Sequence, residues 1–308
     1  MSRIHEALKK AEREGSGVTS LTDSRAPERE ASIAGEREGL VKVAEVLPPP
    51  ADASARVISF RFEDIKERCV QVTWRPDPLT DVFANTELGL EAAEQFRTLR
   101  SRIYHLQTEK SLRVILVTSP ISGDGKSFVA MNLARAIVRQ ADRRVLVIDA
   151  DLRSALLHSS LGAPVSPGLG EYLSGSADEM AVIQHGQEGG LYFIAGGSPV
   201  SNASELLSNA RLKALIERTV PCFDWIIIDS PPCLPVADAS LIAGLCDGVL
   251  LVVRSGSTPS SAARKACHEL QKRNVIGIVL NGVSEKTLTY GSYYGRGQYS
   301  QATSGDST

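Results

Sequence analysis

The sequence predicts a doubly wound α/β fold, in which a mostly parallel sheet is flanked by helices. From residue 111 onward, short apolar runs alternate with helical stretches, and the runs are apolar throughout rather than at every second position. Strands of this kind are typical of parallel sheets that are covered on both faces and joined by right-handed crossovers. The expected strands are residues 114–117, 145–148, 191–194, 225–228, 249–253 and 275–280.

Composition narrows the class of protein. A chain of 308 residues fits one large α/β domain with extensions or two small domains. Its formal net charge of −2 provides no overall positive field that would indicate nucleic-acid binding. Five cysteines without a CxxC pair argue against a disulfide framework or a zinc site and favour reduced, buried thiols. Because no signal sequence or apolar run of roughly 20 residues is found, we expect a cytoplasmic protein.

The chain before the first predicted strand divides into three stretches. Residues 1–14 predict a short amphipathic helix, which is either a frayed terminus or a docking helix for a partner or an anionic membrane surface. Residues 15–85 predict a mostly disordered linker, with a small strand-containing piece within residues 56–76. Residues 86–108 predict a helix with Thr86 as its N-cap and an apolar face at three- and four-residue spacing.

A phosphate-binding loop follows the first predicted strand of the sheet. The segment SPISGDGKS lies between this strand and a predicted helix. Gly123 and Gly125 allow backbone N–H groups to approach a phosphate, and the helix N-terminus favours its negative charge. In this pattern Lys126 reaches the β- and γ-phosphates, and the Ser127 hydroxyl binds Mg²⁺. Pro120 replaces the first glycine of the usual GxxxxGK[ST] pattern, but the strand before and the helix after support the assignment.

Two further predicted strands end in acidic residues. Asp149 and Asp151 follow residues 145–148, and Asp229 follows residues 225–228. Carboxylates at strand tips beside a phosphate loop can hold the metal through water. Asp149 and Asp151 face the same way in an extended chain, so the pair can share metal binding and deprotonation of an attacking hydroxyl. One acid of this kind is often a helix cap, whereas two acidic strand ends favour a nucleotide site.

These motifs resemble those of the bacterial tyrosine kinases of capsule and exopolysaccharide assembly, within the larger MinD/ParA group of P-loop ATPases. The resemblance covers about residues 87–300 and includes SPISGDGKS, VLVIDADLR, IIIDSPP and the closing strand GIVLNGV. It also includes an ExxRxxR helix motif, which in relatives mediates ring-like self-association, and a tyrosine cluster near the C-terminus. These two features consist of Glu94, Arg97 and Arg100, and of Tyr290, Tyr293, Tyr294 and Tyr299.

The resemblance implies an ATP- and Mg²⁺-dependent kinase that phosphorylates its own tail tyrosines, in trans within a homo-oligomer. Asp151 would help to take the proton from the tyrosine, and Arg153 would either stabilise the transferring group or organise the subunit interface. The implied catalytic residues are Lys126, Asp149, Asp151 and Arg153. The implied Mg²⁺ ligands are Ser127, Asp149 and Asp229. The implied nucleotide contacts are Ser122, Gly123, Asp124, Gly125, Lys126, Ser127, Phe128 and Asn281.

Three of these assignments have alternatives. Asn281 either reads the adenine base or closes the last strand with a turn at Gly282. Arg97 and Arg100 could otherwise form a solvated helix face paired with Glu94. The tyrosines of the tail, residues 286–308, are either phosphate acceptors or part of a sticky low-complexity segment. The folded kinase domain itself is expected to span residues 86–285.

The resemblance also sets expectations about partners. The MinD/ParA signature lysine is replaced here by the segment Ser119-Pro120-Ile121, which argues against that subgroup. The competing functions are nevertheless a ParA/MinD-like ATPase switch and a nucleotide-binding scaffold without kinase activity. For a kinase, the implied partners are a separate membrane activator or polysaccharide co-polymerase and a cognate tyrosine phosphatase, without nucleic acid. Such a partner would hold the cytoplasmic protein at the inner face of the membrane.

Overall fold

The computed structural model describes residues 59–84 and 89–283. The predicted N-terminal helix, the Thr86 cap and all four tail tyrosines lie outside these residues. Within them, the central element is an eight-stranded sheet with the order β1-β4-β5-β3-β6-β2-β7-β8. Its strands are β1 (Val70–Gln71), β2 (Val114–Thr118), β3 (Val145–Asp149), β4 (Ile183–His185), β5 (Leu191–Ile194), β6 (Trp225–Asp229), β7 (Gly248–Arg254) and β8 (Val275–Asn281).

The predicted fold class is confirmed, because the sheet is mostly parallel and helices flank it. All six expected strands are present, and they run parallel to one another. Of the two remaining strands, β1 lies within the strand-containing piece expected in residues 56–76, whereas β4 had not been predicted; β4 pairs antiparallel with β5 and so reverses one end of the sheet. These two strands contain only two and three residues.

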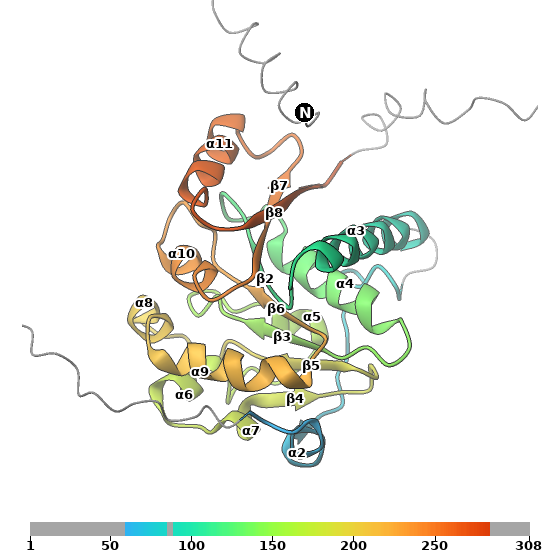
Figure 1. The fold of residues 1–308 in the computed structure, drawn as a ribbon, viewed down its shortest axis with the longest axis vertical. Helices are drawn as coiled ribbons and strands as arrows, with labels where there is room; N and C mark the ends of the chain where they lie inside the picture. Colours follow the sequence, from blue (N-terminus) through green and yellow to red (C-terminus); the bar gives the residue numbers. More distant parts are fainter. Residues whose placement is uncertain (1–58, 85–88, 284–308) are drawn as a thin grey trace, which may run out of the picture. The chain divides into compact units, whose positions relative to one another are not determined.

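Helices cover both faces of the sheet (Figure 1). Successive strand residues point to opposite sides, so that Ile115 and Val117 pack in one core while Val114 and Leu116 pack in the other. Helices α3 (Gly89–Glu109), α4 (Lys126–Val138) and α5 (Leu157–Leu161) contribute to the first core. The second core is lined by α2 (Phe62–Arg68), α6 (Leu169–Ser174), α7 (Glu179–Val182), α8 (Ala203–Leu207), α9 (Ala210–Thr219), α10 (Asp238–Ala243) and α11 (Ser260–Glu269).

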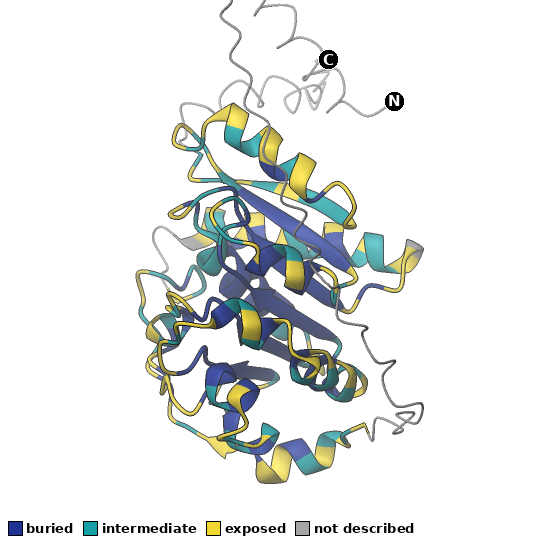
Figure 2. Ribbon diagram, turned by 90° about the vertical axis from the view of Figure 1, so that its left-hand side faces the viewer, coloured by how far each residue is buried: buried dark blue, intermediate teal, exposed yellow. Residues whose placement is uncertain are grey.

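Burial follows this layered arrangement. Figure 2 shows the strands in the centre as buried and the outward faces of the helices as exposed. Strands β2, β3, β5 and β6 are buried along their whole length, as expected for strands covered on both sides. The edge strand β8 differs, since Ile278 and Leu280 are about half exposed. All five cysteines are free, and no described helix is long and apolar enough to cross a membrane.

The segment before α3 is folded further than the sequence suggested. A linker was expected through residue 85, but residues 59–84 include α2 and β1, and β1 extends the sheet by pairing with β4. Trp74 is 3% exposed, and its ring lies against Gly186, where a Cβ would collide with it. The expected strand-containing piece within residues 56–76 is therefore part of the main sheet. Sequence periodicity could not show this, because two residues of strand carry no readable alternation.

Residues 77–84 form a strap across α4, which is the helix that begins at the phosphate loop. The Asn132 side chain accepts a hydrogen bond from the Val82 N–H at 3.1 Å and donates one to the Thr80 carbonyl at 2.9 Å. Arg135, whose side chain is 2% exposed, lies 3.5 Å from Asp81 and 3.2 Å from Glu188. The strap is thus fixed to α4 by the Asn132 amide and by the buried Arg135 guanidinium, which faces Asp81 of the strap and also Glu188 from the turn between β4 and β5.

Glu171 provides a pH-dependent contribution to the stability of this fold. Its carboxylate accepts hydrogen bonds from the backbone N–H groups of Gly168 at 2.8 Å and Ser198 at 3.0 Å. Burial alone raises the pKa of Glu171, but the hydrogen bonds from Ser198 and Gly168 outweigh this and lower the pKa from 4.5 to about 2. The ionised form therefore stabilises α6 and the loop after β5.

We expect Glu171→Gln to be less stable than the parent protein at pH 7, with the difference shrinking as the pH falls. A carboxyl group with a depressed folded pKa contributes stability above its unfolded pKa of 4.5 and loses it toward about 2. Chemical denaturation at pH 7, 5, 4 and 3 would measure this. A gap between the two proteins that stays constant across the series would contradict the assignment.

Candidate active site

The phosphate loop connects β2 to α4 and has a backbone that requires glycine at two positions. Gly123 and Gly125 have φ angles of +87° and +91°, a conformation that residues with a Cβ rarely adopt. At Gly125 a Cβ would also collide with the side chain of Asn281. The first turn of α4 then presents backbone N–H groups that have no partner within the helix. The loop has the features needed to surround a phosphate.

Asp124 stabilises the loop from within. Its side chain is buried and accepts hydrogen bonds from the Ile121 N–H at 3.3 Å and the Thr258 hydroxyl at 2.6 Å. At the end of β7, Arg254 donates a hydrogen bond to the Gly123 carbonyl at 3.0 Å. Asp124 was predicted as a nucleotide contact, which stays a prediction, and the structure shows that its carboxylate is engaged with the protein. Thr258 and Arg254 had not been predicted, because they lie more than a hundred residues from the loop.

The loop also brings together Lys126, Ser127 and the acidic strand ends. The Lys126 ammonium lies 3.1 Å from the Asp151 carboxylate, and the Ser127 hydroxyl donates a 2.6 Å hydrogen bond to Asp229. Asp149 and Asp229 are partners in the pairing of β3 with β6, so the two carboxylates lie at the same edge of the sheet. Three predicted acids thus gather around one predicted lysine. All three acids are buried.

The charges at this site are unbalanced. Burial raises the pKa of Asp149 well above its ordinary value, and the neighbouring Asp229 charge raises it further. Burial also raises the pKa of Asp229 to about 6, although Lys126 opposes the shift. Burial lowers the pKa of Lys126, but Asp229 and Asp151 outweigh it and raise the pKa overall. One lysine does not neutralise three buried carboxylates, so the site favours an additional cation.

The residues present fit a Mg²⁺ ion whose coordination shell is completed by the nucleotide. The Oδ1 atom of Asp229 is buried and has no hydrogen-bond partner within residues 59–84 and 89–283. Mg²⁺ binds oxygen ligands and usually keeps several waters beside one or two carboxylates and substrate phosphates. Within the described residues no preformed cluster of three metal-ligating side chains is found. Asp229 and Ser127 are the best placed ligands.

Asp149 shapes the loop that follows β3. Its two carboxylate oxygens accept hydrogen bonds from the backbone N–H groups of Asp151 and Leu157, both at 3.2 Å. Asp151 in turn accepts one from the Ser154 N–H at 3.1 Å. These bonds fix the loop in which Asp151 faces Lys126. The predicted role of Asp149 as a metal ligand stays a prediction beside this positioning role.

Arg153 points to a partner that the sequence analysis missed. Its guanidinium lies 2.8 Å from the carboxylate of Asp238, which is fully buried at the start of α10. Ser204 in α8 donates a 2.5 Å hydrogen bond to the same carboxylate and accepts one from Arg153 at 3.0 Å. Arg153 thus links the loop after β3 to α8 and α10 within the chain, and its two predicted roles, stabilising the transferring group or organising the subunit interface, stay predictions. Eighty-five residues separate Arg153 from Asp238, so no motif joins them.

We expect Asp238→Asn to lower the rate of the chemical step while leaving ATP binding nearly unchanged. The substitution keeps the shape of the side chain but removes the charge that holds Arg153, while the phosphate loop stays intact. Single-turnover kinetics with an ATP titration would separate the two effects. Ser208→Ala, on the exposed end of α8, is a matched control. A loss confined to ATP affinity would contradict the positioning role.

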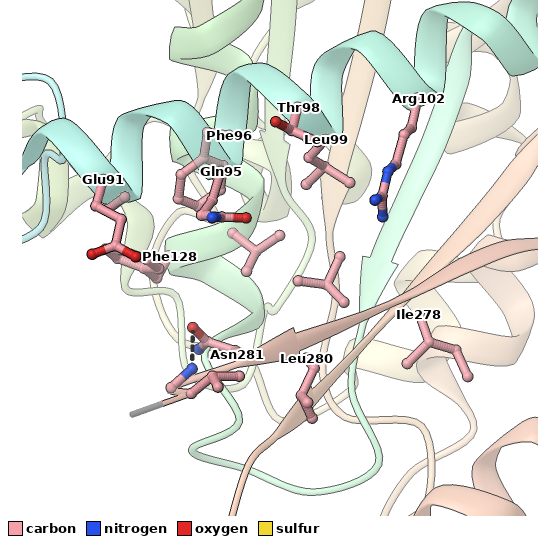
Figure 3. Close-up of a pocket in the computed structure, with 15 residues that line it drawn as sticks. Glu91, Gln95, Phe96, Thr98, Leu99, Arg102, Phe128, Ile278, Leu280 and Asn281 are labelled. Carbon is pink, nitrogen blue, oxygen red and sulfur yellow. Dashed lines mark hydrogen bonds between the residues drawn. The ribbon is translucent and has the colours of Figure 1, made fainter. Parts of the chain in front are cut away.

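An open groove lies beside the phosphate loop, between α3 and the uncovered face of β8. Its volume is about 450 Å³, which is within the range of small-ligand sites. In Figure 3, side chains of α3 such as Phe96, Leu99 and Arg102 project toward the strand that carries Ile278 and Leu280. The groove provides an apolar site next to the phosphate position.

Phe128 and Asn281 line the loop end of this groove. Phe128 packs edge-on against Phe96, with ring centroids 5.8 Å apart. The Asn281 amide donates a hydrogen bond to the Asp124 carbonyl at 2.9 Å and accepts one from the Gly282 N–H at 2.9 Å. Asn281 therefore closes the strand, as one of its two predicted roles required, and also ties β8 to the phosphate loop.

The ExxRxxR residues do not act as one surface in this structure. Arg97 and Glu94 form an exposed ion pair at 2.9 Å, as expected for residues three apart on a helix. Arg100 instead donates a 2.6 Å hydrogen bond to the Ala136 carbonyl in the last turn of α4. Arg100 thus links α3 to α4 within the chain, while Arg97 and Glu94 remain accessible.

Comparison with known proteins agrees with this geometry. The family model described as the CobQ/CobB/MinD/ParA nucleotide binding domain matches residues 115–292. The tyrosine-protein kinase YwqD of Bacillus subtilis is 34% identical over 218 residues, which cover 70% of this chain and 91% of that protein. This chain belongs to the bacterial tyrosine-kinase family. Its nucleotide-binding domain is therefore of the P-loop type.

Other relatives define how much of a longer protein this chain represents. The putative tyrosine-protein kinase EpsB of Ralstonia solanacearum is 37% identical over 212 residues, but this chain spans only 28% of its length. The kinase domain of Escherichia coli ETK superposes with a TM-score of 0.63 at 31% identity, covering 74% of this chain and 88% of that one. Family members thus share this kinase domain in proteins of very different length.

Proposed function

We propose that this protein is an ATP- and Mg²⁺-dependent tyrosine autokinase that phosphorylates tyrosines of its own C-terminal tail. The observation that carries the proposal is the arrangement of Lys126, Asp151 and Asp229 around one phosphate loop. Membership of the tyrosine-kinase family supports the choice of tyrosine as acceptor. The tail cluster of Tyr290, Tyr293, Tyr294 and Tyr299 supplies the hydroxyls.

The chemistry follows from the positions of these side chains. ATP bound at the loop would draw the Lys126 ammonium from Asp151 toward the β- and γ-phosphates. The freed Asp151 carboxylate would accept the proton of a tyrosine hydroxyl as its oxygen bonds to the γ-phosphorus. The bond from that phosphorus to the β–γ bridging oxygen breaks, and ADP leaves. Phosphoryl transfer depends mainly on positioning and charge stabilisation. This suits a site in which the Lys126 side chain is the group that moves.

The remaining residues position the nucleotide and the loops. Mg²⁺, when bound by Ser127 and Asp229 with the phosphates, supplies positive charge for the transferring group. Ser122, Gly123, Gly125 and the first turn of α4 offer backbone N–H groups to the phosphates. The groove near Phe128 and Asn281 would take the adenine base.

The tyrosines would come from a second copy in a ring-like oligomer, with Arg97 and Glu94 on the contacting surface. Four phosphates would add roughly −6 to −8 of charge to the tail. Repulsion of this size would separate the subunits and reset a cycle of polysaccharide polymerisation and export. A separate membrane activator would hold the protein at the inner face of the membrane, and a tyrosine phosphatase would reverse the reaction.

The test compares the parent protein with a variant in which all four tail tyrosines are replaced by Phe. With γ-labelled ATP and Mg²⁺, we expect label on tyrosine in the parent protein and almost none in the variant. Equal ATP binding by both proteins is the control for the nucleotide site. Hydrolysis of ATP without labelled protein would instead favour a ParA/MinD-like switch, and binding without hydrolysis would favour a scaffold.

Mixing experiments test transfer between copies. A protein with an intact site but four Phe substitutions is combined with Lys126→Met, which keeps its tyrosines. Label on the Lys126→Met protein is expected if the tail is phosphorylated in trans. Absence of label in this mixture, with normal label in the parent protein, would mean transfer within one chain.

A further inference from the structure

We propose that a second anion site, formed by Arg113, Arg143 and Arg144, binds the phosphate group of a ligand. The three arginines line a polar pocket of about 330 Å³ together with Gln107, Pro221, Phe223 and Asp224. Arg113 directly precedes β2, and Arg143 and Arg144 directly precede β3. The pocket therefore lies at the amino ends of these strands, opposite the edge that carries the phosphate loop. Five-residue strands separate the two edges by roughly 17 Å.

Aromatic rings fix the orientation of two of the guanidinium groups. Arg144 lies over the ring of Phe62, 4.2 Å from its centroid, and Arg143 lies 5.8 Å from the ring centroid of Tyr104. A cation stacked on an aromatic face is held by the ring quadrupole. Less side-chain freedom is then lost when a ligand binds, which favours binding at such a pair.

The arginines keep hydrogen-bond donors available. The guanidinium of Arg144 forms no hydrogen bond or ion pair with any residue of the described ranges 59–84 and 89–283. Arg113 donates one 3.3 Å hydrogen bond, to the Val220 carbonyl. Arg143 lies 3.1 Å from Asp224, whose other oxygen accepts a hydrogen bond from the Arg144 backbone N–H at 2.9 Å. Asp224 thus orders Arg143 and Arg144, but it forms an ion pair with only one of the three guanidinium groups.

The charge of the pocket selects the ligand. Three guanidinium groups facing one carboxylate leave a surplus of positive charge, and planar forks match phosphate oxygens in a bidentate manner. The volume accommodates a phosphate monoester or a pyrophosphate. The phosphate could be carried by a small molecule or by a phosphotyrosine of another copy, and only the second source rests on the proposed kinase function.

The experiment measures pyrophosphate binding to the full chain with Lys126→Met in the phosphate loop, by calorimetry at low ionic strength. We expect saturable binding that is weakened at least about tenfold by Arg144→Gln and by Arg113→Gln. Arg264→Gln, an exposed arginine on α11, is the matched control and should bind as before. Absence of binding, or equal losses in all three variants, would overturn the site. Arg113 is exposed, so its variant remains informative if Arg144→Gln fails to fold.

Two further measurements sharpen the outcome. Asp224→Asn removes the competing carboxylate and should tighten pyrophosphate binding, whereas weaker binding with a normal melting temperature would contradict the proposed geometry. A synthetic tail peptide with phosphotyrosine is then compared with its unphosphorylated form. Binding of the phosphorylated peptide alone, lost in Arg144→Gln, assigns the tail as the source. Binding of pyrophosphate but of neither peptide assigns a small phosphorylated molecule.

Discussion

Lys126→Met is expected to lower phosphorylation of the tail at least about 1000-fold, because a preorganised charge on a transferring phosphoryl group has effects of this size. In the structure the Lys126 ammonium faces Asp151 and is further held by the charges of Asp229 and Asp149. Without it, the γ-phosphate of ATP would approach three buried carboxylates. Single-turnover transfer of labelled phosphate to the tail measures the loss.

Two control variants separate charge from geometry in this prediction. Lys213→Met removes an exposed lysine on α9 and should leave the transfer rate unchanged. Lys126→Arg retains the positive charge but has a planar fork in place of a compact ammonium, so we expect it to restore little of the activity. A Lys126→Met protein that retains more than a tenth of the parent rate would exclude the proposed role of this lysine.

Arg135→Met is expected to destabilise the protein by about 3–5 kcal/mol, because it leaves a buried carboxylate without its partner. Arg135 is 2% exposed and lies between Asp81 of the strap and Glu188. Asp81 is itself buried, so the charge remaining after substitution has little access to water. For a domain of this size the melting temperature should fall by roughly 10 °C. Denaturant unfolding and calorimetry would measure both quantities.

Removing the second charge tests the cause of that loss. The double variant Arg135→Met with Asp81→Asn should recover a substantial part of the stability, since the uncompensated carboxylate is then absent. Arg97→Met, which removes an exposed arginine of α3, should change stability by less than about 0.5 kcal/mol. Equal effects of Arg97→Met and Arg135→Met would contradict the importance of burial.

The central sheet could be predicted because its strands are long and apolar throughout. All six expected runs became parallel strands, and those in the centre of the sheet are buried on both faces, as their apolar pattern indicated. The bounds of β1 within the expected piece of residues 56–76, and the existence of β4, could not be predicted, because both strands are short and contain polar residues such as Gln71 and Gln184. Tertiary contacts hold them, including the packing of Trp74 against Gly186. Because of such contacts, α2 and β1 are folded although the sequence assigned residues 15–85 mostly to a linker.

The candidate site likewise contains residues that could be predicted from the sequence and residues that could not. Lys126, Asp151 and Asp229 could be predicted because parallel strands deliver their carboxyl ends to one edge of the sheet. The pairing of Arg153 with Asp238 could not be predicted, since it depends on how α10 packs beside the loop after β3. The spacing of residues in the sequence predicts where they lie on one helix or strand. Contacts between different elements can be predicted only once the fold is known. The predicted tail acceptors stay predictions, because they lie outside the described residues.

The strap over α4 can couple nucleotide binding to the local stability of a segment elsewhere in the chain. Local opening of residues 77–84 would free Asn132 and Arg135 on the helix that begins with Lys126. If ATP favours the closed state, thermodynamic reciprocity requires that strap closure also favours ATP. Amide hydrogens in the strap should then exchange more slowly when ATP is bound, although the strap is held at Asn132 and Arg135 of α4, beyond the phosphate loop. Hydrogen exchange at Val82 would report occupancy of a site on another element.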